Sequence, residues 1–268
     1  MLNCSDQVVV IARVVQHLYN QLQRTLLHVD IETFDYGIIE VISGLSDRKI
    51  RSFVPESGRL LYVINDAHKK VTSITTFHNS PAIVSGGSEG QVRLWKLGRD
   101  SQQLIATMKE HRMAVTAVRV TQDDLECVSS GSDGQMLTWS LTRHIRLKQM
   151  IKTANFQGVD YLPDNSQFIA CGSDRFATYF DAFEGKQLRE VELSDKELFD
   201  IAVDPTGMKF ALVGADQLVK LVDYDEGKIT HLGRGHPDSI TCVTWSPDGA
   251  HIVSGSADGS IFIWQAPR

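Results

Sequence analysis

Three segments of the chain each contain a histidine, a serine and an acidic residue, which are the residue types of a nucleophilic triad. They are His68, Ser85 and Glu89, then His111, Ser129 and Asp133, and then His236, Ser254 and Asp258. In such a triad the carboxylate orients the imidazole, which takes the proton of the attacking hydroxyl. Buried side chains of these types also satisfy one another's hydrogen bonds, and such a network fixes a hairpin and a loop. We therefore interpret the three sets as structural and predict no catalytic residue.

The acidic residue of each set lies six positions before a large apolar residue, and this spacing recurs along the chain. The six pairs are Asp47 with Phe53, Glu89 with Trp95, Asp133 with Trp139, Asp174 with Phe180, Asp216 with Val222, and Asp258 with Trp264. Their apolar members are separated by 42, 44, 41, 42 and 42 residues. A period of about 40 to 45 residues is typical of four-stranded propeller blades. The spacing predicts an all-β propeller with six recognisable repeats.

Strand and turn patterns fill the rest of each repeat. Residues 71–74, 115–118 and 240–245 alternate in the manner of half-buried strands. Turn residues stand at 204–207 and 246–249, where proline presets φ and glycine supplies positive φ. These patterns favour antiparallel strands joined by short turns over helices.

Composition and charge exclude several classes of protein. Of the 268 residues, 42% are hydrophobic and 22% are charged, as in ordinary soluble globular chains. The net charge of -6 disfavours binding to nucleic acid. No apolar run approaches the roughly 20 residues that span a bilayer, and the first residues lack a basic leader. We expect no nucleic-acid partner, no membrane association and no secretory signal.

The cysteines and the known catalytic motifs give no sign of a metal or cofactor. Cys4, Cys127, Cys171 and Cys242 lie far apart without a CxxC pair, which fits neither a zinc cluster nor a disulfide framework. The sequence contains no Walker loop and no HExxH motif. We expect reduced thiols in the cytoplasm, no metal, no cofactor and no small-molecule substrate.

Repeats that run from a histidine, as in the pair Gly235-His236, to a terminal tryptophan are a feature of one large family. In this respect the sequence resembles the WD-repeat proteins. The resemblance implies a buried hydrogen-bonded chain of histidine, serine, acidic residue and tryptophan in each regular repeat. The implied sets are His68, Ser85, Glu89 and Trp95; His111, Ser129, Asp133 and Trp139; and His236, Ser254, Asp258 and Trp264. Leaving one buried member unpaired is expected to cost about 1 to 3 kcal/mol.

The pattern is degenerate in two central repeats. Where a histidine is expected, one repeat has residues 153–155 and the other has residues 194–196, and Val222 replaces the terminal tryptophan. We expect these two repeats to depend more on apolar packing than on a polar chain.

Four cationic residues fall in loops that the WD-repeat family places on one rim. They are Lys69, Lys70, Arg112 and Arg175. A solvated charged rim is one interpretation of these residues, and contact with a partner protein is the alternative.

The ends of the repeat array are less regular. In WD-repeat proteins an N-terminal segment usually supplies the outer strand of the last blade, and residues 17–25 are the candidate here. One period before Phe53 lies the β-prone run 8–11, which forms a partial seventh blade if it joins the fold. We divide the chain into residues 1–27, which supply closing or partial-blade strands, and a propeller over residues 28–268. Whether the propeller has six or seven blades stays open.

Within the WD-repeat class, four segments resemble one family, the WD-repeat proteins of cilia and flagella. These segments are residues 47–68, 85–98, 109–120 and 218–236. The resemblance implies a non-enzymatic structural protein of the cytoskeleton in motile cilia, inside the lumen of axonemal doublet microtubules. The implied partners are tubulin and other microtubule inner proteins. Members of that family look like two consecutive propellers, and this chain corresponds to the C-terminal one.

Two other functions compete with this interpretation. In the first alternative, the chain is an adaptor of a ubiquitin ligase or signalling complex, because WD-repeat propellers commonly have that role. Adaptors often carry Trp-Asp-x-Arg after a repeat end, whereas this chain has WKLG, WSLT and FDAF there. The second alternative, an enzyme, needs titratable groups beyond those of the polar chains, and the sequence points to none.

Overall fold

The computed structural model describes residues 9–11, 31–33, 39–44, 46–98 and 101–267. In these residues every regular element is a β-strand, and no helix is long and apolar enough to cross a membrane. The chain divides into two compact units. Unit 1 contains residues 1–133 and 137–147, and unit 2 contains residues 134–136 and 148–268.

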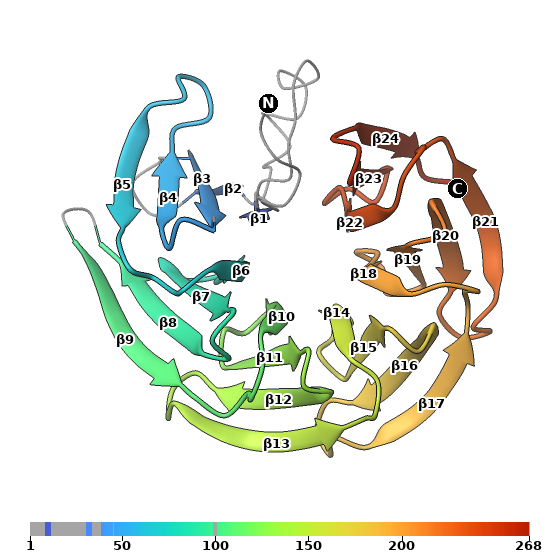
Figure 1. The fold of residues 1–268 in the computed structure, drawn as a ribbon, viewed down its shortest axis with the longest axis horizontal. Coiled ribbons are helices and arrows are strands. Elements are labelled where there is room, and N and C mark those ends of the chain that lie inside the picture. The colour runs from blue at the N-terminus through green and yellow to red at the C-terminus, as the bar shows by residue number, and fades with distance from the viewer. Residues whose placement is uncertain (1–8, 12–30, 34–38, 45, 99–100, 268) are drawn as a thin grey trace. The chain divides into compact units, whose positions relative to one another are not determined.

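The first thirteen strands form three antiparallel sheets that follow one another in chain order (Figure 1). The last two of these strands contain residues of both units. Sheet 1 contains β1 (Val9–Ile11), β2 (Ile31–Thr33), β3 (Ile39–Gly44), β4 (Ile50–Phe53) and β5 (Leu60–Ile64). Sheet 2 contains β6 (Val71–Thr76), β7 (Ala82–Gly87), β8 (Val92–Leu97) and β9 (Gln102–Met108). Sheet 3 contains β10 (Val115–Val120), β11 (Glu126–Gly131), β12 (Gln135–Ser140) and β13 (Ile145–Ile151).

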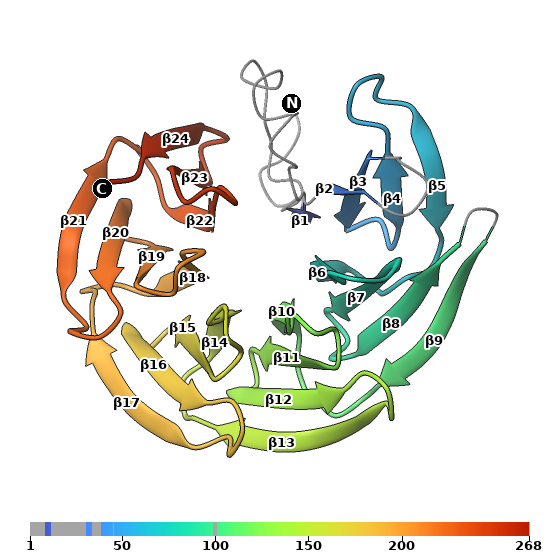
Figure 2. The same ribbon diagram turned by 180° about the vertical axis from the view of Figure 1, so that it is seen from behind.

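The remaining strands, all in unit 2, form three further sheets of the same kind (Figure 2). Sheet 4 contains β14 (Phe156–Tyr161), β15 (Gln167–Gly172), β16 (Phe176–Asp181) and β17 (Gln187–Glu192). Sheet 5 contains β18 (Leu198–Val203), β19 (Lys209–Gly214), β20 (Leu218–Asp223) and β21 (Ile229–Arg234). Sheet 6 contains β22 (Ile240–Trp245), β23 (His251–Ser256) and β24 (Ile261–Gln265). Six repeated sheets confirm the predicted all-β propeller class.

The sheets repeat one another in register as well as in strand order. In sheets 2 to 6 the pairing of the first two strands shifts after a single residue pair, as between Val71 and Ser73 or between Ile240 and Cys242. Such an irregularity bends a strand and strengthens its twist. The same register shift occurs at the same position in five sheets, so each repeat of about 42 residues forms the same structural unit.

Sheet 1 departs from this pattern at its first strand. Both β1 and β2 pair with β3, and β1 lies along its Ile42–Gly44 half while β2 lies along its Ile39–Val41 half. Residues 9–11 thus join sheet 1 and form no sheet of their own within the described residues. Residues 17–25, the candidate for an outer strand, lie outside the described residues. Sheet 6 has three strands in the part of the chain that the structure describes.

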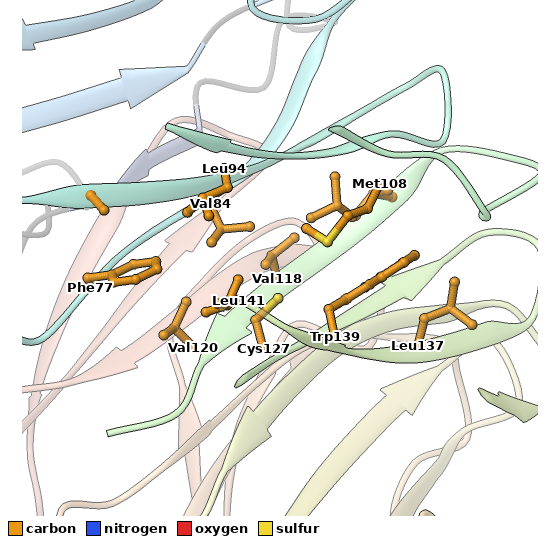
Figure 3. Close-up of a cluster of buried hydrophobic side chains, with 13 residues drawn as sticks. Phe77, Val84, Leu94, Met108, Val118, Val120, Cys127, Leu137, Trp139 and Leu141 are labelled. Atoms are coloured by element: carbon orange, nitrogen blue, oxygen red, sulfur yellow. The ribbon is translucent and has the colours of Figure 1, made fainter. Parts of the chain in front are cut away.

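The core of unit 1 lies between neighbouring sheets. One cluster fills the space between sheets 2 and 3 and includes Leu94, Val118 and the fully buried Trp139 (Figure 3). A second cluster joins sheets 1 and 2 through Ile42, Ile74 and other apolar side chains. The approach is close, because a Cβ added at Gly86 would lie 2.5 Å from Val115 Cγ1.

The core of unit 2 is built in the same way. A cluster between sheets 4 and 5 includes Tyr179, Phe210 and Val222. Val222 stands where other repeats have tryptophan, and its side chain is fully buried. A smaller cluster, with Val219 and Val243, joins sheets 5 and 6.

Candidate functional site

One hairpin of each sheet has a recurring backbone feature. This hairpin joins the second and third strands in sheets 2 to 6, and it joins β3 to β4 in sheet 1. The residue after the hairpin acid has a positive φ in all six sheets, with values from 67 to 84°. These residues are Arg48, Gly90, Gly134, Arg175, Gln217 and Gly259. Glycine occupies this conformation readily, whereas a side chain makes it unfavourable. Glycine therefore suits three of the hairpins, and arginine or glutamine is retained in the other three.

In sheet 2 the hairpin acid is held by a histidine in the loop before β6. His68 Nδ1 lies 2.5 Å from Glu89 Oε1, and His68 Nε2 lies 2.8 Å from Ser85 Oγ. Trp95 Nε1 donates to the same Ser85 oxygen at 2.9 Å. The second carboxylate oxygen of Glu89 accepts the backbone N–H of Lys69 at 3.0 Å. The network thus ties the hairpin, the loop and the third strand together.

Sheet 3 repeats the arrangement with aspartate in place of glutamate. His111 Nδ1 lies 3.2 Å from Asp133 Oδ1, and His111 Nε2 lies 2.8 Å from Ser129 Oγ. Trp139 Nε1 donates to Ser129 Oγ at 2.8 Å. Asp133 Oδ2 accepts the backbone N–H of Arg112 at 2.8 Å.

These contacts assign the direction of donation. The tryptophan N–H donates to the serine oxygen, so the serine O–H is directed to the acceptor nitrogen Nε2 of the histidine. The carboxylate accepts only, so the proton of the neutral imidazole resides on Nδ1. The chain of donors therefore runs from tryptophan through serine and histidine to the carboxylate.

The order carboxylate, imidazole, hydroxyl matches that of a serine nucleophile and its base. The burial differs, because Ser85 and Ser129 are both 0% exposed. Each hydroxyl also accepts a tryptophan N–H, which occupies one of its two lone pairs and holds the oxygen inside the sheet. A hydroxyl held in this way has no access to a substrate, so the geometry favours hydrogen bonding over nucleophilic chemistry.

The surroundings of the histidines and of Glu89 shift their pKa values. Burial lowers the pKa of His68 and of His111, and the neighbouring carboxylates only partly oppose this effect. Burial alone would raise the pKa of Glu89, but the hydrogen bonds from His68 and from backbone N–H groups outweigh it and lower that pKa. The neutral histidine and ionised carboxylate are thus the stable forms near neutral pH.

Sheet 6 holds its histidine differently from the predicted set. His236 Nε2 lies 2.7 Å from Ser254 Oγ, which accepts Trp264 Nε1 at 2.8 Å, as in the other two networks. His236 Nδ1, however, is hydrogen-bonded to Ser260 Oγ at 2.9 Å and not to Asp258. Asp258 Oδ1 instead accepts the backbone N–H of Ser260 at 2.6 Å. The predicted pairing of His236 with Asp258 is therefore corrected, because a serine two residues further on reaches the imidazole first.

Sheet 4 replaces the histidine by a lysine. Lys152, from the loop after β13, forms an ion pair with the hairpin carboxylate of Asp174 and a second one with Glu190 at 3.0 Å. Its ammonium also donates to Thr178 Oγ1 at 2.9 Å. The side chain is mostly buried, and three oxygen acceptors surround its charge.

Sheet 5 also uses a lysine, but from a different place in the fold. Lys220 on β20 is 3% exposed, and its ammonium pairs with the hairpin carboxylate of Asp216. Ser194, in the loop position of the missing histidine, donates to Asp216 Oδ2 at 3.1 Å. These two repeats are expected to depend more on apolar packing than on a polar chain, yet both keep a polar partner for the hairpin acid, because a mostly buried aspartate still requires a compensating partner.

Sheet 1 has a more exposed version of the same contact. Arg51 lies four residues after the hairpin acid Asp47 and pairs with it, as Lys220 does with Asp216. Arg51 and Lys220 each lie near the start of the strand that follows the hairpin, so each cation is close to the carboxylate of the turn. Among the described residues, no group of three histidine, cysteine, aspartate or glutamate side chains is arranged to hold a metal ion.

The four predicted rim residues lie at the same end of their own sheets as the hairpins. Lys69 and Arg112 follow the network histidines directly, and both side chains are exposed, whereas Lys70 is half-buried. Arg175 occupies the left-handed position of the sheet 4 hairpin and pairs with Glu192 at 3.0 Å. The first three residues belong to unit 1 and Arg175 to unit 2.

Comparison with known proteins identifies the repeat. The family model "WD domain, G-beta repeat" matches residues 58–96, 102–140 and 227–265. These segments end just after Trp95, Trp139 and Trp264, so they contain the three repeats with histidine networks.

The relatives cover most of the chain. "Cilia- and flagella-associated protein 52" of Chlamydomonas reinhardtii is 44% identical over 230 residues, and that of Homo sapiens is 42% identical over 229 residues. The chain is a WD-repeat homologue of this protein. Each match covers 85% of this chain and 37% of the relative, so this chain spans little more than a third of the relatives' length. A "Serine-threonine kinase receptor-associated protein" of Dictyostelium discoideum is 27% identical over 207 residues, which are 76% of this chain and 69% of that protein.

Proposed function

We propose that this homologue is a non-enzymatic structural protein of motile cilia and flagella, located in the axonemal cytoskeleton. The observation that carries the proposal is the 41 to 44% identity over 85% of the chain to relatives from mammals and from an alga that share a cilia- and flagella-associated name. The buried networks support a non-enzymatic role, since their serines are closed to substrates.

The finer part of the proposal concerns the partners. The chain acts as a microtubule inner protein that binds tubulin and neighbouring inner proteins in the lumen of doublet microtubules. Repeated sheets with short, protected edges suit this role, because they present several rigid surfaces without a central active site. The relatives are longer than this chain, so the partner contacts are proposed for this chain and do not follow from the similarity alone.

The networks have a structural function in this account. Each one links a loop, a hairpin and a third strand through buried groups, and a buried donor without a partner costs about 1 to 3 kcal/mol. The members are His68, Ser85, Glu89 and Trp95 in sheet 2; His111, Ser129, Asp133 and Trp139 in sheet 3; and His236, Ser254, Trp264 and Ser260 in sheet 6.

Localisation with fractionation tests the proposed function. The tagged full chain is expressed in ciliated cells, and isolated axonemes are extracted first with detergent and then with high salt. The account predicts that the chain stays with the doublets through both extractions, whereas the tag alone is lost in the detergent step. A diffuse cytosolic pool with no axonemal fraction would contradict it.

One observation favours a second candidate, an adaptor of a signalling complex. The Dictyostelium relative with a receptor-associated name matches 76% of this chain at 27% identity. An adaptor would be recovered with soluble signalling or ubiquitin-ligase subunits from the detergent extract, and a structural protein of the doublet would be recovered with tubulin after salt extraction.

A further inference from the structure

Two neighbouring loops of unit 1 carry positive charge without a compensating partner. The loops are residues 65–70, before β6, and residues 109–114, before β10. Their cationic side chains are Lys69, Lys70, Lys109 and Arg112. Among the described residues none of these four side chains forms an ion pair. We call these two loops the cationic loops.

The acidic side chains of the same loops are already neutralised. Asp66 pairs with Arg48 at 2.7 Å, and Glu110 pairs with Arg146. The hairpin acids Glu89 and Asp133 are hydrogen-bonded to neutral histidines, which do not cancel their charge, so the four cationic side chains face two carboxylates. The excess of charge on the cationic loops is therefore positive, although the whole chain has a net charge of -6.

The hairpin of sheet 2 joins the two loops into one surface. Ser88 N donates to Lys70 O at 3.0 Å, on the side of the first loop. On the other side, a Cβ at Gly90 would lie 2.4 Å from His111 O and 2.8 Å from Met113 O. The two cationic loops thus lie on either side of one hairpin and form one surface with it. Met113, which is 55% exposed, adds an apolar side chain to this surface.

The corresponding loops of unit 2 have the opposite character. The loop before β18 presents the exposed side chains of Asp195 and Glu197 beside one lysine, and the loop before β22 presents Asp238 after Pro237. The residue types after the histidine position are therefore not a general requirement of the repeat. The cationic loops carry an excess of positive side chains, whereas these two loops of unit 2 carry an excess of acidic ones, and this contrast argues for a ligand and against a solvated rim.

We propose that the cationic loops bind an acidic, extended peptide segment of a partner protein, with carboxylates on Lys69, Lys70 and Arg112 and one apolar residue on Met113. The proposal deepens the proposed scaffold function by naming the chemistry of one partner. Charge complementarity of this kind steers association and sets specificity. A nucleic acid fits less well, because the loops contain no phenylalanine, tyrosine or tryptophan on which a base could stack.

Fluorescence anisotropy with defined probes tests the proposal on the purified full chain. The probes are a labelled peptide of alternating glutamate and glycine with one central leucine, the same peptide with lysine for glutamate, and single-stranded DNA of equal formal charge. The wild-type chain is expected to bind only the glutamate peptide, with an affinity that falls as salt is added. DNA binding as tight as peptide binding, or no peptide binding, overturns the proposal.

Matched variants locate the binding surface. The triple change Lys69→Glu, Lys70→Glu, Arg112→Glu should weaken glutamate-peptide binding at least about tenfold, and Met113→Ala should weaken it about two- to threefold. The control Asp195→Asn, Glu197→Gln changes the equivalent loop of unit 2 and should leave the affinity unchanged. Thermal melting shows that each variant is folded. Undiminished binding by the triple variant overturns the proposal, while axonemal retention is measured separately and tests the scaffold function alone.

Discussion

Sheets 2 and 3 hold the hairpin carboxylate with a neutral histidine, whereas sheets 4 and 5 hold it with a charged lysine. In the first pair the carboxylate accepts from the imidazole and from a backbone N–H, and the network continues to a buried tryptophan. In the second pair the carboxylate is neutralised by Lys152 or Lys220. The difference shows that the fold requires a partner for this carboxylate but does not require one particular residue.

The two solutions have different physical consequences. A network of neutral donors depends on every member, because loss of the serine strands two buried nitrogen atoms. An ion pair depends on both charges, and removal of one leaves the other buried without compensation. Sheets 4 and 5 should therefore be most sensitive to loss of charge, and sheets 2 and 3 to loss of hydrogen bonding and to acid.

The largest effect is expected from Lys220→Met. This change leaves the mostly buried Asp216 without its ammonium partner, and breaking a buried pair typically costs about 3 to 5 kcal/mol. Urea unfolding measures the loss of free energy. The control is Lys228→Met, which removes an exposed pair with Glu226 and should cost at most about 1 kcal/mol. Equal losses in the two variants would show that Lys220 has no special role.

Ser129→Ala should have the next largest effect. It leaves His111 Nε2 and Trp139 Nε1 unpaired in a buried site, and we expect a loss of about 2 to 4 kcal/mol in the free energy of unfolding. Ser254→Ala is the matched change in sheet 6, where Trp264 remains partly exposed and water can replace the serine. Its loss should be closer to about 1 kcal/mol. A larger loss at Ser254 than at Ser129 would contradict the account.

Acid should loosen sheets 2 and 3 before sheets 4 and 5. Burial lowers the pKa of His68 and His111 in the folded chain, so the unfolded chain binds more protons as the pH falls. Their contribution to stability is complete above the unfolded pKa of about 6.5 and decreases as the pH falls below it toward the folded values. Hydrogen exchange, corrected for intrinsic rates, should show earlier loss of protection in β7 and β11 than in β15 and β19. Equal or reversed loss would refute this assignment.

The smallest effect concerns a hairpin backbone. Gln217 has a φ of 67°, in the position where three other hairpins have glycine. Gln217→Gly should stabilise the chain by about 0.5 to 1 kcal/mol, since glycine adopts this conformation without a Cβ penalty. Gln217→Ala keeps the Cβ and should give no gain. Thermal unfolding of both variants compares them, and an equal gain from alanine would disprove the backbone explanation.

Much of the fold can be predicted from the spacing of acidic and apolar residues. Glu89 and Trp95 delimit a hairpin and a strand that are local in sequence, so a regular period reports the sheet directly. The same holds for His68 and Ser85, which lie in one repeat and whose types leave few alternative partners. Sequence alone did not predict that β1 and β2 share one edge of β3, because that arrangement depends on chain topology rather than on local pattern.

The lysine partners were missed for two different reasons. Lys152 precedes its sheet by a whole loop, and nothing in the sequence indicates that its long side chain reaches Asp174. Lys220 carried a readable signal, because it lies four residues after the hairpin acid Asp216, as Arg51 does after Asp47. The family pattern predicts Asp258 as the partner of His236 and gives no role to Ser260, which forms that hydrogen bond in the structure.

A double-mutant cycle across Asp216 and Lys220, compared with one across Asp133 and His111, tests the central claim most directly. The variants are Asp216→Asn with Lys220→Met, and Asp133→Asn with His111→Leu, each made singly and together, and urea unfolding gives the coupling energy of each pair. The account predicts coupling of about 1 to 3 kcal/mol in both cycles, with the lysine pair at least as strongly coupled as the histidine pair. Additive changes at Asp216 and Lys220 would show that lysine does not replace histidine as the partner of the hairpin carboxylate.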